Sequence, residues 1–131
     1  MAKILGLDLG AKRIGVAISD GEIVSTLSTI DSTNREEAIS KILEIVRNEE
    51  VSKIVLGLPV GQSQSEDIVR SFAIELNKSI DIPISFEDET LTSKEAERLL
   101  SDIKINPKSK KYKEEIDRIS AKLILEQYLK K

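Results

Sequence analysis

The segment KILGLDLGAKRIGVAISDGEIVSTLSTI, residues 3–30, contains three runs with the character of β-strands. Residues 3–9 are an apolar run with one acid, residues 13–19 alternate large and small side chains, and residues 22–30 are rich in Val, Ile and Thr. Asp20-Gly21, between the second and third runs, is a strong signal for a tight hairpin turn. Three successive strands with short connections predict an antiparallel meander.

The remainder of the chain alternates between helices and strands. Thr33 and Thr92 each precede a Glu by three residues, a capping-box pattern that predicts a helix start. Ser63 or Ser65 is the expected N-cap of a further helix. The predicted helices cover residues 34–48, 66–78, 92–100 and 114–129, the predicted strands cover 53–58 and 82–86, and a mobile loop is expected over 104–113. Because strands that alternate with helices pair in parallel, we expect an α/β fold with a mixed sheet and helices on both faces.

Composition excludes several classes of site. The 131 residues include no His and no Cys, so neither a Ser-His-Asp nucleophile nor a Cys/His zinc site can form. With 40% apolar and 33% charged residues and no linker or repeat, we expect a single globular domain over residues 1–131. The chain contains no signal-peptide pattern and no run of 18 apolar residues, and a cytoplasmic location is expected.

Acidic residues occur at three positions where burial is expected. Asp8 lies within an apolar strand, Glu87-Asp88-Glu89 follows another strand, and Asp117 falls on the apolar face of the last helix. Each position also has an ordinary structural explanation. Asp8 could accept hydrogen bonds from backbone N–H groups, residues 87–89 could form a solvated turn, and Asp117 could be an acid near the start of a helix. Taken together, they indicate a carboxylate site for Mg²⁺ or Mn²⁺, and two such ions can hydrolyse a phosphodiester without His or Cys.

Basic residues are concentrated in one segment although the net charge is −3. Residues 104–113 contain no acid and five lysines, namely Lys104, Lys108, Lys110, Lys111 and Lys113. Together with Lys12 and Arg13, they form a candidate contact surface for a phosphate backbone. The alternative is that these lysines belong to a solvated loop with no ligand. With four aromatic residues in the chain, a base-stacking platform is not expected.

Four segments carry a resemblance to a known family. ILGLDLGAKRIGVAISD (4–20), IVLGLP (54–59), DETLTSKEAERLL (88–100) and DRISAKLILEQYL (117–129) resemble the YqgF family, also called RuvX, of pre-16S rRNA nucleases or Holliday junction resolvases. The resemblance implies an RNase H-like fold with a five-stranded mixed sheet whose first three strands are antiparallel. It also implies that Asp8, Glu89 and Asp117 are catalytic and metal-binding. The implied activity is metal-dependent hydrolysis of phosphodiester bonds in 5′-end maturation of pre-16S rRNA, with structured RNA as the partner.

Other functions stay open from the residues alone. A Holliday junction resolvase would use the same acids on four-way DNA, and a non-catalytic module would bind RNA or a ribosome factor on the same fold. A sugar-kinase or actin-like ATPase shares the first-strand motif Asp8-Leu9-Gly10, but it needs two related domains, and this chain has room for one. Endonuclease or exonuclease action, and a monomeric or homodimeric state, are also left open.

Overall fold

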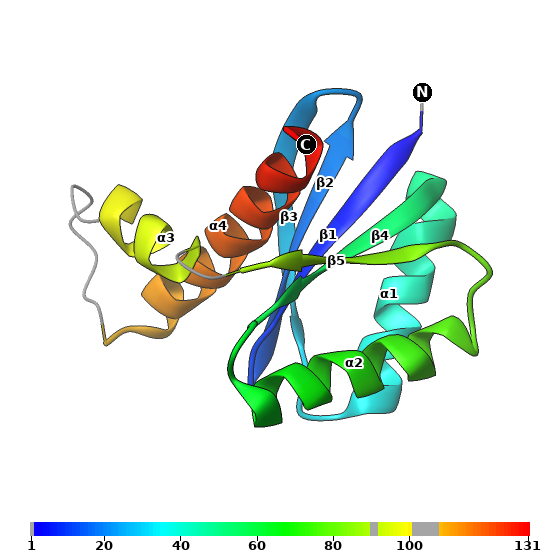
Figure 1. Ribbon diagram of the computed structural model, residues 1–131, viewed down its shortest axis with the longest axis horizontal. Helices are drawn as coiled ribbons and strands as arrows, with labels where there is room; N and C mark the ends of the chain where they lie inside the picture. Colours follow the sequence, from blue (N-terminus) through cyan, green and yellow to red (C-terminus); the bar gives the residue numbers. More distant parts are fainter. Residues whose placement is uncertain (1, 90–91, 101–107) are drawn as a thin grey trace.

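The computed structural model describes residues 2–89, 92–100 and 108–131 (Figure 1). Five strands form a mixed sheet in the order β3-β2-β1-β4-β5. The strands are β1 (Lys3–Leu9), β2 (Arg13–Asp20), β3 (Ile23–Asp31), β4 (Val51–Leu58) and β5 (Ile84–Asp88). The helices are α1 (Arg35–Glu49), α2 (Ser63–Asn77), α3 (Thr92–Leu100) and α4 (Lys110–Leu129).

The pairing of the strands confirms the predicted fold class. β1 pairs antiparallel with β2, and β2 pairs antiparallel with β3, as expected for the meander. β1 pairs in parallel with β4, and β4 pairs in parallel with β5. Gly21 has a φ of 67° in the turn between β2 and β3, a conformation that glycine adopts without steric cost. The register places Asp8 of β1 opposite Gly15 of β2.

Helices cover both faces of the sheet, as Figure 1 shows. α1 and α2 pack on one face over the larger apolar cluster, which includes Leu5 and Leu7 of β1. α4 packs on the other face over a smaller cluster, and α3 packs against α4. Because successive side chains of a strand point to opposite faces, Gly6 and Asp8 lie on the side that α4 covers. The fold therefore turns the acid of β1 toward the last helix.

The first two helices begin at residues other than those predicted. Asn34, and not Thr33, caps α1, since its side-chain oxygen accepts a hydrogen bond from the N–H of Glu37 at 3.1 Å. Thr33 instead binds the carboxylate of Asp31. α2 begins three residues before its predicted start, with Gln62 at the N-cap position and neither of the expected serines. The strand ends agree with the predicted ones to within two residues.

The last helix is longer than predicted. Ser109 accepts a hydrogen bond from the N–H of Tyr112 at 3.1 Å, and this cap starts α4 at Lys110. The expected loop over 104–113 is therefore wrong for residues 110–113, while residues 104–107 lie outside the described part of the chain. Asp117 consequently lies two turns inside α4 and not at its start. Among the helices described, none is long and apolar enough to cross a membrane.

Candidate active site

Glycines let α4 approach the sheet closely. A Cβ atom added to Gly15 would lie 1.9 Å from the main-chain oxygen of Asp117, so the backbone of α4 rests directly on β2. A Cβ atom added to Gly57 of β4 would lie 2.6 Å from Oε2 of Glu89. β1, which carries Asp8, lies between these two strands. Because Gly15 and Gly57 have no side chain, Asp117 and Glu89 lie against the two strands that flank Asp8.

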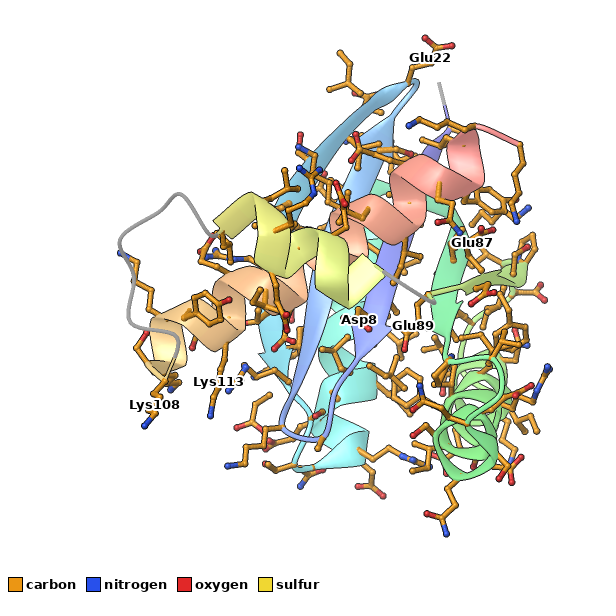
Figure 2. The ribbon with its side chains drawn as sticks, turned by 60° about the vertical axis from the view of Figure 1, so that its left-hand side comes forward. Asp8, Glu22, Glu87, Glu89, Lys108 and Lys113 are labelled. Carbon is orange, nitrogen blue, oxygen red and sulfur yellow. The ribbon has the colours of Figure 1, made fainter. Side chains whose placement is uncertain are left out.

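Asp8 and Glu89 form a pair of carboxyl groups at one end of the sheet (Figure 2). The N–H of Glu89 donates to the carbonyl oxygen of Leu58 at 3.0 Å, which fixes the residue after β5 beside the end of β4. Burial raises the pKa of Asp8 well above its usual range, and a hydrogen bond to Glu89 and the charges of Glu89 and Asp117 raise it further. Two carboxyl groups in this contact must share either a proton or a cation.

Asp117 lies next to this pair but has a different partner. Nε of Arg13 donates to Oδ2 of Asp117 at 2.9 Å, and the two side chains are 18% and 23% exposed. Burial raises the pKa of Asp117, and the ion pair with Arg13 offsets part of that effect. Within residues 2–89, 92–100 and 108–131, no group of three or more acidic side chains is arranged to hold a metal ion. The structure brings together two of the three predicted acids and pairs the third with a guanidinium.

The chemistry of the donors fits a divalent cation. Carboxylate oxygens are the ligands that Mg²⁺ and Mn²⁺ prefer, and Asp8 and Glu89 present such oxygens side by side in a partly buried position. A cation between them would remove the repulsion that their two negative charges create. The third carboxylate, that of Asp117, binds Arg13 through Oδ2 in this structure.

Glu87 has a structural contact that the sequence pattern did not reveal. Its side chain is buried, accepts a hydrogen bond from Nε2 of Gln127 at 2.6 Å and pairs with Nζ of Lys131 at 2.9 Å. Nε2 of Gln127 also donates to the main-chain oxygen of Asp88 at 2.9 Å. Glu87 therefore joins β5 to the end of α4, while Glu89 in the same acidic run faces Asp8.

The predicted basic residues separate into two groups. Arg13 contacts Asp117, and Lys12 is exposed in the turn after β1. The exposed lysines around the start of α4, where Figure 2 labels Lys108 and Lys113, are Lys108, Lys110, Lys111 and Lys113. Lys104 lies outside the described residues. The lysines of this second group therefore lie several residues before Asp117 along the chain, at the solvent-exposed beginning of the same helix.

A cavity of about 410 Å³ opens at the ends of β1 and β4, beside the carboxyl pair. Glu89 lines it, together with apolar side chains such as Ile14 and Phe72 and polar ones such as Ser32 and Gln62. No single stretch of sequence predicts this cavity, because its lining comes from both hairpin and helix segments. Its position leaves Glu89 accessible from the side of α1 and α2.

Comparison with known proteins shows the family to which the chain belongs. Residues 2–131 match the family described as RuvX: Holliday junction resolvase. A relative from Roseiflexus sp. (strain RS-1), named "Putative pre-16S rRNA nuclease", is 38% identical over 133 residues, which cover 97% of this chain and 93% of the relative.

Two solved structures share the fold. The fowlpox virus Holliday junction resolvase has a TM-score of 0.56 and 11% identity, covering 98% of each chain. Thermus thermophilus RuvC in complex with Holliday junction substrate has a TM-score of 0.53 and 13% identity, covering 99% of this chain and 96% of that one. The chain therefore belongs to the RuvX family, nucleases with an RNase H-like fold that generally use divalent metal ions.

Proposed function

We propose that this protein is a single-domain cytoplasmic nuclease that cuts structured RNA with the help of Mg²⁺ or Mn²⁺, and that its substrate is the 5′ end of pre-16S rRNA. The contact between the carboxyl groups of Asp8 and Glu89, with Asp117 beside them, carries this proposal. The name of the Roseiflexus relative supports the choice of RNA.

The roles of the residues follow from their positions. Asp8 and Glu89 would hold the cation, and Asp117 would complete the ligand set. The bound cations would supply an activated water and stabilise the departing oxygen. In the metal-free protein, the high pKa of Asp8 favours a proton held between Asp8 and Glu89, so cation binding releases that proton. Lys12 and the lysines near the start of α4 would bind phosphates on either side of the cut.

Four-way DNA is the second candidate substrate. The description of the matching family and the junction bound in the Thermus thermophilus RuvC structure favour it. Either substrate would place a phosphodiester at the same carboxylates. The two candidates are therefore distinguished by measuring cleavage of both in one assay.

The deciding experiment is a cleavage assay on a labelled 5′ pre-16S rRNA fragment and a labelled four-way DNA junction, each with Mg²⁺, Mn²⁺ or EDTA. Asp8→Asn is the test variant, and Asp20→Asn, which changes an exposed acid in the β2–β3 hairpin, is the matched control. We expect metal-dependent cutting of the RNA by the wild type and by Asp20→Asn, and none by Asp8→Asn.

Other outcomes of this assay contradict the proposal in distinct ways. Cutting of the DNA junction alone would replace the RNA substrate by branched DNA. Cutting in EDTA, or by Asp8→Asn, would refute the carboxylate mechanism. If the folded wild-type protein cut neither substrate, a non-catalytic binding module would replace the nuclease.

A further inference from the structure

The ion pair between Arg13 and Asp117 separates the third acid from the other two. We propose that Arg13 is a positioning residue that holds Asp117 away from Asp8 and Glu89 until a phosphate of the nucleic acid takes its guanidinium. Binding of the nucleic acid and binding of the divalent cation would then strengthen each other. This inference rests on the proposed function and adds a regulatory step to it.

The geometry makes this pair stronger than an ordinary surface ion pair. Nε of Arg13 and Oδ2 of Asp117 are 2.9 Å apart, a normal distance for a charge-assisted hydrogen bond. Both side chains are less than a quarter exposed, so water screens their attraction less than it would at the surface. Arg13 therefore competes effectively with a cation for the carboxylate of Asp117.

The backbone leaves Asp117 within reach of the carboxyl pair. Its main-chain oxygen lies against Gly15, and Gly15 is the residue of β2 opposite Asp8. The charge of Asp117 already acts on Asp8 in this arrangement. A change of side-chain rotamer, without movement of α4, would therefore be enough to bring the third carboxylate toward the other two.

A phosphate is a suitable competitor for Arg13. The guanidinium has five N–H donors in a planar fork that matches two phosphate oxygens, and its hydrogen bond to Asp117 uses Nε. Once released, Asp117 would face two further carboxylates, an arrangement that becomes favourable when a cation neutralises them. Phosphate and cation thus favour the same state of Arg13 and Asp117, which makes their effects on binding reciprocal.

The test measures Mn²⁺ affinity by isothermal titration calorimetry, with and without a nuclease-resistant phosphorothioate RNA hairpin. For the wild type, we expect the hairpin to tighten Mn²⁺ binding by about 5- to 150-fold, the usual range of coupling between sites. Mn²⁺ should tighten hairpin binding by the same factor. In Arg13→Gln, Mn²⁺ alone should bind more tightly than in the wild type, and the coupling factor should fall toward one.

Three further variants separate the possible causes. Arg47→Gln makes the same substitution at an exposed arginine in the last turn of α1 and leaves the ion pair intact, so it should retain the coupling. Arg13→Lys keeps the charge without the planar fork and should show a reduced coupling factor, and it replaces Arg13→Gln if that variant does not fold. Asp117→Asn should weaken Mn²⁺ binding in the presence of the hairpin.

The outcomes distinguish failure of this inference from failure of the proposed function. If Asp117→Asn binds Mn²⁺ like the wild type, Asp117 is not a metal ligand and the proposed site is wrong. If Asp117→Asn weakens Mn²⁺ binding but Arg13→Gln keeps the full coupling, the site stands and the role of Arg13 is refuted. Equal effects of Arg47→Gln and Arg13→Gln would also refute it, because charge alone would then explain the result.

Discussion

Replacing Gly15 by alanine adds one methyl group at the contact between β2 and α4. The new Cβ atom would lie 1.9 Å from the main-chain oxygen of Asp117, whereas real Cβ atoms essentially never come closer than 3.0 Å to such a neighbour. The neighbour is backbone and not the end of a flexible side chain, so a rotamer change cannot relieve the clash. α4 must therefore move away from the sheet by about 1 Å or more.

This movement sets the expected size of the effect. A displacement of about 1 Å at a catalytic group can cost about 100-fold in rate, so we expect Gly15→Ala to lower kcat by about that factor. Forcing an extra methyl group into a packed interface costs about 1–3 kcal/mol of folding free energy. The variant should thus be less stable but folded, with a loss of activity larger than its loss of folded protein.

The assay combines urea unfolding with the rate of metal-dependent RNA cleavage, measured at a temperature where all the variants are folded. Gly6→Ala is the matched control, because its Cβ atom would lie 3.1 Å from Cβ of Leu125 and 3.2 Å from the main-chain oxygen of Ala121, so α4 would need to shift by only a few tenths of an ångström. We expect Gly6→Ala to retain most of the activity. A Gly15→Ala variant with wild-type stability and activity would show that α4 does not rest on β2 as described.

Other perturbations test the same arrangement. In EDTA, the raised pKa of Asp8 means that the folded state binds its proton more tightly than the unfolded state, so stability should fall as pH rises above the usual range of an aspartate. Asp8→Asn should flatten this fall and be more stable than the wild type at pH 7–8 by urea unfolding, and an unchanged slope would contradict the assignment. Mn²⁺ at 100 times its Kd should stabilise the folded wild type by about 2.7 kcal/mol and stabilise Asp8→Asn by less, measured by thermal unfolding. Equal stabilisation of the two proteins would show that the ion binds elsewhere. Gln127→Leu removes a hydrogen-bond donor from the buried carboxylate of Glu87, so it should lower the free energy of unfolding by about 1–3 kcal/mol with little change in kcat. A large loss of activity without a loss of stability would instead give Gln127 a role in the site.

Sequence periodicity was sufficient to predict the sheet and the position of one acid. Alternation in β1 and β2 predicts strands with two different faces, and Asp8 stands out because its neighbours in β1 are apolar or glycine. The family resemblance then singled out Glu89, within a run of three acids, as the predicted catalytic residue. In the structure, Glu89 contacts Asp8, whereas Glu87 is buried against Gln127 and Lys131.

Contacts between distant residues could not be predicted in this way. Arg13 and Asp117 are 104 positions apart, and no local pattern indicates that they form an ion pair. The beginning of α4 was predicted too late because the lysines before Glu114 were interpreted as loop residues. The Ser109 cap is a short local signal that this composition-based interpretation overlooked.

The two faces of the sheet differ in how much apolar surface they bury. α1 and α2 cover the larger cluster, while α4 rests on glycines and on a smaller cluster that includes Ala17, Val55 and Ile124. Segments that bury less apolar surface open at lower free energy in native-state hydrogen exchange. The amides of α4 should therefore exchange faster than those of β1 and β4, through an opening that leaves most of the sheet folded. Such an opening would separate Asp117 from Asp8, so catalytic competence would be lost at a milder denaturant concentration than the fold itself.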